Sequence, residues 1–191
     1  MTGAGGRLLL RALSYTLATI TAVRPGSLAD PTPCPDWDLR ALLLHANDSL
    51  ITLHTALTLH RISRCQPEVA PAVDPVANCR HNGAALVAEL VRAEQPDELI
   101  AVGGFPLDSN IVANTGAVEI AVHGWDVARA CRYDRPIPHA LAVELLTVSR
   151  LLVGRTDRQP MFAPSVHVPS SAAAGDRLAA FLGRTVSGDR C

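Results

Sequence analysis

The sequence predicts an all-α protein, an antiparallel four-helix bundle with a short C-terminal helical tail. The first observation behind this class is the composition. Hydrophobic residues make up 48% of the 191 residues and aromatic residues only 4%, so the core must consist mainly of Leu, Val and Ala. A β-sandwich usually requires more aromatic and β-branched side chains. The second observation is that four long segments repeat apolar residues with the helical period, and modest connections separate them.

The first half of the chain is expected to form three helices separated by prolines. The first covers about residues 7–23 and stops at a Pro-Gly pair. The second covers about residues 37–62, and Asp36 is placed to cap its N-terminus. Residues 63–75 are interrupted by prolines and are expected to form a loop, after which a third helix covers about residues 76–93.

The second half is expected to form one long and one shorter helix. A glycine-containing turn at 102–106 precedes the fourth helix, which Asp108 or Ser109 can cap. This helix ends near Cys131, and a shorter helix follows over about residues 139–153.

The C-terminal part is expected to be a tail rather than a second domain. It contains an extended stretch at 165–169 and a last short helix over about residues 176–182. The predicted organisation is therefore a bundle over residues 1–155 and a tail packed on it over residues 156–191.

Composition excludes several classes of partner. The net charge is −1 and no basic block occurs, which gives no basis for a nucleic-acid partner. No stretch of about 18 residues is free of charge and proline, so no membrane span is expected. Arg11 interrupts the first apolar run, which favours a helix of the mature protein over a signal peptide. The five scattered cysteines are typical of reduced thiols in a cytoplasmic protein. All 17 basic residues are Arg, which indicates a GC-rich coding genome.

Glu119 and His123 are the first residues that indicate a chemical site. They are four positions apart in the fourth helix, so their side chains lie on one face, roughly one turn apart. On spacing alone, a hydrogen bond on the helix surface is the simpler interpretation. The flanking residues at 117–118 and 120–122 are all apolar, however, which indicates a buried helix. A buried carboxylate beside a buried imidazole is costly unless the two are paired or bound to metal.

Asp126 extends this polar face. It lies three residues after His123, so its carboxylate can orient that histidine from a second shell around a metal. The alternative is a structural pair with a nearby arginine such as Arg129.

His45 is the best candidate for a ligand from a facing helix. Among the histidines of the second helix, His45 is the one that is embedded among apolar residues. At 100° per residue, Ser49 and Thr52 share its stripe, which is small and mildly polar, as the lining of a pocket should be. We therefore predict a metal site formed by His45, Glu119 and His123, with Ser49 and Thr52 lining the substrate pocket. Without a facing partner, His45 would be interpreted as a satisfied core histidine.

The remaining distinctive residues carry weaker signals. Trp37 and Trp125 are interpreted as packing anchors, and Trp125 is expected to point away from His123. Cys34 lies at a helix entrance, where a helix N-terminus can lower a thiol pKa, although a buried inert thiol is the simpler interpretation. The sequence contains no Gly-rich phosphate loop, no nucleophile elbow and no HExxH pair.

Two longer motifs resemble those of a known family. Residues 31–42 together with His45 resemble the opening TPCPxWxxRxLxxH of the mycothiol-dependent maleylpyruvate isomerase N-terminal family. Residues 119–130 resemble its ExxxHGWDLARA segment, and residues 177–184 are similar to the tail of its short actinobacterial branch. The resemblance runs across nearly the whole chain and implies a DinB-like, metal-binding four-helix bundle.

The resemblance also implies a chemistry. His45, Glu119 and His123 match the family's metal ligands, which implies a Zn²⁺-type ion with an open coordination position. Two histidines and a carboxylate also suit Fe²⁺ or Ni²⁺. Members of the family use mycothiol, a low-molecular-weight thiol, for isomerisation or S-transfer. The isomerase itself carries an additional C-terminal domain, whereas a short tail follows residue 155 here, which argues against maleylpyruvate as the substrate.

Three hypotheses about function follow. The first is a metal-dependent mycothiol S-transferase or isomerase that acts on an electrophilic small molecule. The second is a metal-dependent hydrolase that activates water, and the third is a non-catalytic protein that binds a metal or a small ligand. A purely structural zinc site would need a fourth ligand, for which Asp126 or Cys34 are candidates. The sequence leaves open whether the bundle forms a homodimer.

Overall fold

The structure is a computed structural model that describes residues 3–62, 74–92, 99–153 and 163–186. Within these ranges it contains six α-helices, one 3₁₀ turn and three short strands. In chain order the elements are α1 (Ala4–Ile20), η1 (Pro25–Ser27), α2 (Leu39–Leu59), β1 (Arg61–Ile62), α3 (Pro75–Arg92), β2 (Leu99–Val102), β3 (Phe105–Asp108), α4 (Ser109–Ala130), α5 (His139–Leu152) and α6 (Ala174–Phe181).

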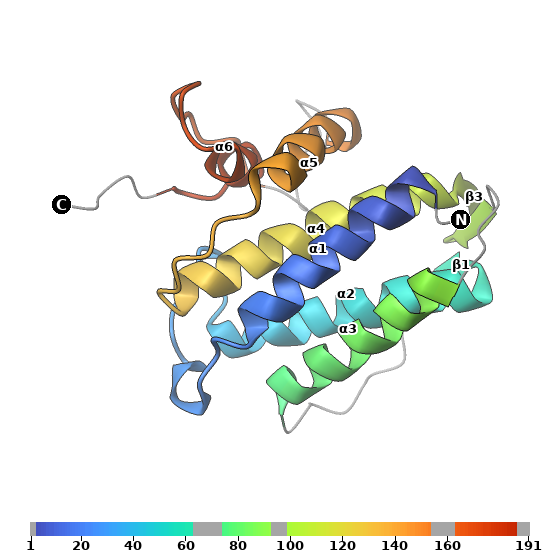
Figure 1. Cartoon of the computed structure of the whole chain (residues 1–191), viewed down its shortest axis with the longest axis horizontal. Coiled ribbons are helices and arrows are strands. Elements are labelled where there is room, and N and C mark those ends of the chain that lie inside the picture. Colours follow the sequence, from blue (N-terminus) through green and yellow to red (C-terminus); the bar gives the residue numbers. More distant parts are fainter. Residues whose placement is uncertain (1–2, 63–73, 93–98, 154–162, 187–191) are drawn as a thin grey trace.

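The four long helices α1 to α4 form one bundle (Figure 1). α1 packs against α3 and α4, and α2 packs against the same two helices from the other side. α5 lies against α4 and α1, and α6 packs on α5. The predicted all-α class is thus confirmed. The tail helix begins two residues earlier than predicted. The expected extended stretch at 165–169 has no regular secondary structure, although its Val166 amide donates a hydrogen bond to the Ala180 carbonyl.

The helices run as two parallel pairs, which differs from a simple antiparallel order. The Cys79 thiol donates to the Leu43 carbonyl at 3.1 Å, and the Asn82 amide donates to Asn47 Oδ1 at 2.7 Å. Positions therefore increase together along α2 and α3, which run in the same direction, while α1 and α4 run the opposite way (Figure 1). The C-terminus of α2 and the N-terminus of α3 therefore lie at opposite ends of the bundle (Figure 1).

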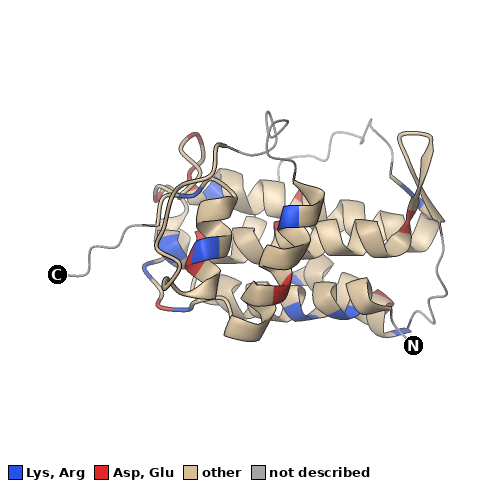
Figure 2. Cartoon of the chain, turned by 90° about the horizontal axis from the view of Figure 1, so that it is seen from above, with Lys and Arg blue, Asp and Glu red and all other residues tan. Residues whose placement is uncertain are grey.

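Charged residues of both signs occur on the described helices. Figure 2 shows Arg residues and acidic residues interspersed along several helices. None of the described helices is both long and apolar enough to span a lipid bilayer.

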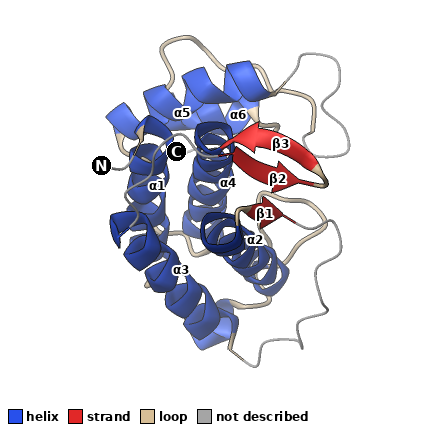
Figure 3. Cartoon of the chain, turned by 90° about the vertical axis from the view of Figure 1, so that its right-hand side faces the viewer, coloured by secondary structure: helices blue, strands red, loops and turns tan. Residues whose placement is uncertain are grey.

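A three-stranded sheet lies at one end of the bundle, beside α2 and α4 (Figure 3). β1 pairs in parallel with β2, and β2 pairs antiparallel with β3 around a turn at Gly103 and Gly104, both of which have positive φ. The sequence predicted the turn but not the strands. Segments of two to four residues are too short to show a strand period, and they are formed by pairing with distant residues.

The core lies between the four bundle helices and consists largely of leucine. Leu9, Leu13, Leu42 and Leu43 are completely buried. Burial of each such side chain contributes about 2 kcal/mol to the stability of the bundle.

α2 begins later than predicted. Its N-cap is Asp38, whose side chain accepts a hydrogen bond from the Ala41 amide at 2.8 Å, so the prediction of Asp36 as the cap is wrong. Asp36 instead lies in the preceding turn, where the Thr32 hydroxyl bonds the Trp37 carbonyl at 2.8 Å. Trp37 consequently lies outside the helix.

Candidate metal centre

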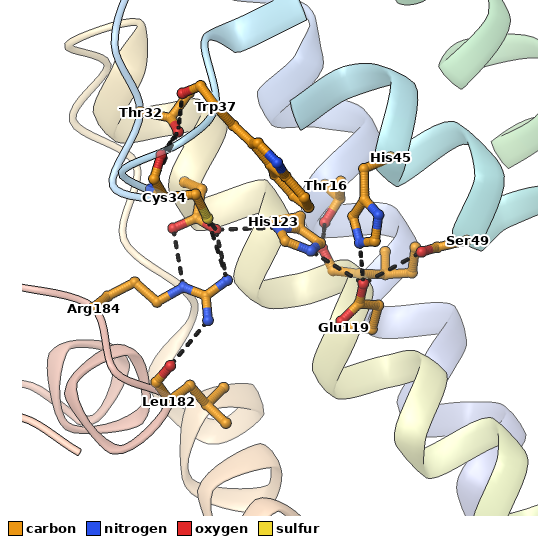
Figure 4. A network of polar contacts seen from close by, with 12 residues as sticks. Thr16, Thr32, Cys34, Trp37, His45, Ser49, Glu119, His123, Leu182 and Arg184 are labelled. Carbon is orange, nitrogen blue, oxygen red and sulfur yellow. Dashed lines mark hydrogen bonds and ion pairs between the residues drawn. The ribbon is translucent and has the colours of Figure 1, made fainter. Parts of the chain in front are cut away.

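α2 and α4 bring the three predicted ligands together (Figure 4). His45 Nε2 lies 2.8 Å from Glu119 Oε1, and His123 Nε2 lies 3.1 Å from the same oxygen. One ligand atom from each of these residues lies within 4.8 Å of the other two, which is close enough for all three to bind one ion. The pair on α4 was visible in the sequence, whereas the approach of His45 depends on how the two helices pack.

The second ring nitrogen of His123 is held by Asp126. Nδ1 of His123 lies 3.1 Å from Asp126 Oδ2, and the Asp126 side chain is fully buried. This contact directs Nε2 toward Glu119 and His45, in the way that an outer carboxylate orients a metal-binding histidine.

Arg184 is the arginine that pairs with Asp126. Its Nη2 donates to Asp126 Oδ2 at 3.1 Å, while its Nη1 donates to the Leu182 carbonyl at 3.0 Å (Figure 4). The sequence alternative, Arg129, lies over the ring of Trp125 instead, 5.4 Å from the ring centroid. Arg184 was not identified as a site residue because it is 58 positions from Asp126 and no periodicity connects them.

The pKa values of Glu119 and His123 are both shifted toward the charged form. Burial opposes charge on Glu119, but hydrogen bonds with His123 and His45 outweigh it and hold the pKa of Glu119 well below its usual range. Burial also opposes charge on His123, but its bonds to Asp126 and Glu119 raise its pKa to about 9. A mixed set of two imidazole nitrogens and one carboxylate oxygen fits Zn²⁺, Fe²⁺ or Ni²⁺.

The candidate ligands line a cavity of about 1090 Å³. Ser49 and Thr52 also line it, and the Ser49 hydroxyl donates to Glu119 Oε1 at 3.3 Å. Trp37 lies in its wall with its ring centroid 4.6 Å from that of His45, so this residue, predicted as a packing anchor, contacts a candidate ligand. Among the described histidines, His45 and His123 are the ones in the cavity wall.

The chain is similar to known proteins over most of its length. A sequence model of the mycothiol maleylpyruvate isomerase N-terminal domain family matches residues 9–128, which include His45, Glu119, His123 and Asp126. This chain belongs to that family. Two relatives, both uncharacterized proteins of Mycobacterium tuberculosis from different strains, are each 30% identical over 181 residues, which cover 92% of this chain and 95% of the relative. No solved structure matches the chain.

Membership in the mycothiol maleylpyruvate isomerase N-terminal family makes the chain mycothiol-related and places it among metal-binding, DinB-like proteins. The family match ends at residue 128, within α4. Arg184 therefore reaches the centre from a part of the chain that the family match does not cover.

Cys34 lies beside this centre, on the far side of His123 from Glu119. Its thiol donates to Asp126 Oδ2 at 3.5 Å and accepts from Arg184 Nη2 at 3.6 Å. Burial, followed by the negative charge of Asp126, raises the pKa of Cys34 to about 12. The lowered thiol pKa considered from the sequence is thus not found, and Cys34 is held as a neutral thiol.

Proposed function

We propose that this protein holds a divalent metal, with Zn²⁺ as the first candidate, between His45, Glu119 and His123, and uses it in a mycothiol-dependent S-transfer or isomerisation of an electrophilic small molecule. The observation that carries the proposal is the convergence of three ligand atoms in the wall of a cavity large enough for small molecules. A Zn²⁺ ion with three protein ligands keeps a position open and lowers the pKa of a bound thiol or water.

The surrounding residues support a catalytic rather than a structural ion. A structural zinc site usually has four protein ligands. Asp126 faces Nδ1 of His123, the ring nitrogen opposite to the one that faces Glu119, and Cys34 contacts Asp126 on that same side. Neither is therefore placed to be a fourth ligand with His45 and Glu119.

Each residue of the centre has a distinct task in this proposal. Asp126 and Arg184 orient His123, and the Ser49 hydroxyl holds Glu119 Oε1. Trp37 covers one side of the His45 ring and limits the access of water from that direction. In the transfer itself, the thiol loses its proton and the sulfur forms a C–S bond with the electrophilic carbon of a multiple bond. The π-bond of that multiple bond breaks, its electron pair moves away from the attacked carbon, and the atom that receives the pair takes up the proton.

Metal content tests the ligand assignment. We expect elemental analysis to find one ion per chain in the wild type, and to find it strongly reduced in His45→Ala and His123→Ala. His54→Ala is the matched control, because His54 is on α2 but does not line the cavity. Full metal stoichiometry in both ligand variants, with circular dichroism showing them folded, would refute the assignment. The identity of the retained ion distinguishes Zn²⁺ from Fe²⁺ and Ni²⁺.

Product analysis tests the reaction class. Purified protein is incubated with electrophilic test compounds, with and without mycothiol, and products are identified by mass spectrometry. A thiol adduct or an isomer that forms only with mycothiol supports the proposal. A product enlarged by water in the absence of thiol would instead show a hydrolase.

A further inference from the structure

An apolar surface runs along α4 away from the candidate ligands. Counting back from Glu119 by three, four, seven and eight residues reaches Gly116, Thr115, Val112 and Ile111, which all line the cavity. This spacing places them on one face of the helix, over about 12 Å toward its N-terminus. Apart from the Thr115 hydroxyl, the face presents no polar side chain.

The facing walls of this part of the cavity are also apolar. They come from α2, all three strands and the end of α5, and their residues are Leu53, Ile62, Val102, Leu107, Leu152 and Val153. Several side chains in this region are open to solvent: Ile111 is 43% exposed, Leu152 38% and Leu107 37%. A ligand that covered them would gain the hydrophobic free energy of their removal from water.

Outside the candidate metal centre, the cavity offers little to an anion. Among the described lining residues, Arg184 is the side chain with a permanent positive charge, and it is neutralised by Asp126 and only 12% exposed. The exposed acidic residues Asp36 and Asp48 also line the cavity and would repel a carboxylate or a phosphate.

The candidate ligands divide the cavity into two unlike ends. Along α4, the apolar face at 111–116 lies before Glu119 and His123, and Asp126 follows them in the helix. Cys34 and Arg184 line the cavity where they contact Asp126. A two-substrate reaction requires a place for each partner on either side of the reacting atoms.

We infer that the acceptor molecule is uncharged and has an extended hydrocarbon part, which lies along α4 between Leu53 and Leu107 while its electrophilic atom reaches the three candidate ligands. This inference rests on the proposed function, because it names the substrate class of the same site. Leu53 packs directly on α4 at Gly116, since a Cβ at this position would lie 2.5 Å from a Leu53 methyl carbon and push that side chain aside.

Binding of two fluorescent probes tests the inference without turnover. The neutral probe is N-phenyl-1-naphthylamine, and the anionic probe is 8-anilinonaphthalene-1-sulfonate, which has a similar ring system. We expect the wild type to bind the neutral probe more tightly, and Ile111→Asp to weaken this binding at least about tenfold, because a carboxylate in an apolar contact must be desolvated. Gly116→Ala should also weaken it. Val91→Asp is the control, because Val91 is 68% exposed on α3 and outside the cavity.

Two results would overturn the inference. The first is tighter binding of the anionic probe than of the neutral probe. The second is equal binding of the neutral probe by the wild type and Ile111→Asp, which includes the case that neither binds it. Ile111→Ser serves as a second variant if Ile111→Asp does not fold. The same samples are analysed for metal. If the wild type contains its full metal but does not bind the neutral probe, the acceptor class alone is refuted. Missing metal in a wild type that binds the neutral probe concerns the proposed function alone, and His45→Ala should bind the probe as the wild type does.

Discussion

Arg184 donates to the buried carboxylate of Asp126 across 3.1 Å, and the same carboxylate holds Nδ1 of His123. The C-terminal tail is thereby connected to a candidate metal ligand through a single side chain. Burial opposes ionisation of Asp126, but His123 and Arg184 outweigh it and keep its pKa below the usual range. The centre therefore combines residues of the family domain with one residue of the tail.

We expect Arg184→Met to destabilise the protein by about 3 kcal/mol and to weaken metal binding about tenfold, because it leaves the Asp126 carboxylate buried without its cationic partner. Urea unfolding and competition with a chromogenic chelator measure the two effects. In the double variant Asp126→Asn/Arg184→Met the charge is absent, so much of the stability should return. If the single and double variants unfold alike, the ion pair does not explain the loss.

The Cys34 thiol should react slowly with iodoacetamide at pH 8, because its pKa of about 12 leaves almost none of it as thiolate. In Asp126→Asn the negative charge is removed while Arg184 remains next to the sulfur, so the pKa of Cys34 should fall and alkylation should accelerate. Mass spectrometry of the labelled peptide follows the rate, and Cys34→Ser identifies the signal. An unchanged or slower rate in Asp126→Asn would contradict the prediction.

Close packing of α1 on α4 depends on Gly124. A Cβ at this position would lie 2.3 Å from Thr16 Oγ1, and Thr16 is fixed by its 2.8 Å hydrogen bond to the Ile120 carbonyl. Gly124→Ala should therefore cost about 1–3 kcal/mol in the free energy of unfolding. Gly26→Ala is the matched control, because nothing lies within 4 Å of its added carbon. Equal stability of the two variants would show that the helices separate at little cost.

Removal of metal should leave the bundle folded. Without an ion, Glu119 Oε1 lies within hydrogen-bond distance of both histidines and Ser49, and the leucine core does not involve the centre. After chelation we expect unchanged helical circular dichroism and a lower Tm that rises again with added Zn²⁺, as mass action requires. A loss of helicity on chelation would indicate a structural ion instead.

The metal-free protein should lose stability in alkaline solution. The pKa of His123 is raised to about 9 in the folded state, against about 6.5 in an unfolded chain. Its contribution is therefore complete below about pH 6.5 and disappears as the pH rises through about 9. Urea unfolding of the chelated protein between these values measures the decline, and His123→Gln should flatten it. A decline that is as steep in His123→Gln would assign it to other groups.

The sequence by itself predicted the helices and one pair of site residues. The apolar period and the caps predicted α4 nearly to its ends, with Asp108 as the observed N-cap. Glu119 and His123 could be paired because both lie on this one helix, where the spacing determines which side chains share a face. The motif around His45 and the family resemblance were also present in the sequence alone.

Tertiary structure decided what surrounds that pair. The parallel course of α2 and α3 and the small sheet involve residues that are far apart in the chain. Trp37 contacts His45 from the turn before α2, where the helical period does not apply. Arg184 meets Asp126 because α6 packs on α5 and α5 on α4, which places the end of the tail beside the bundle. Periodicity describes contacts within one helix. The position of Arg184 and the apolar part of the cavity depend instead on how separate elements pack together.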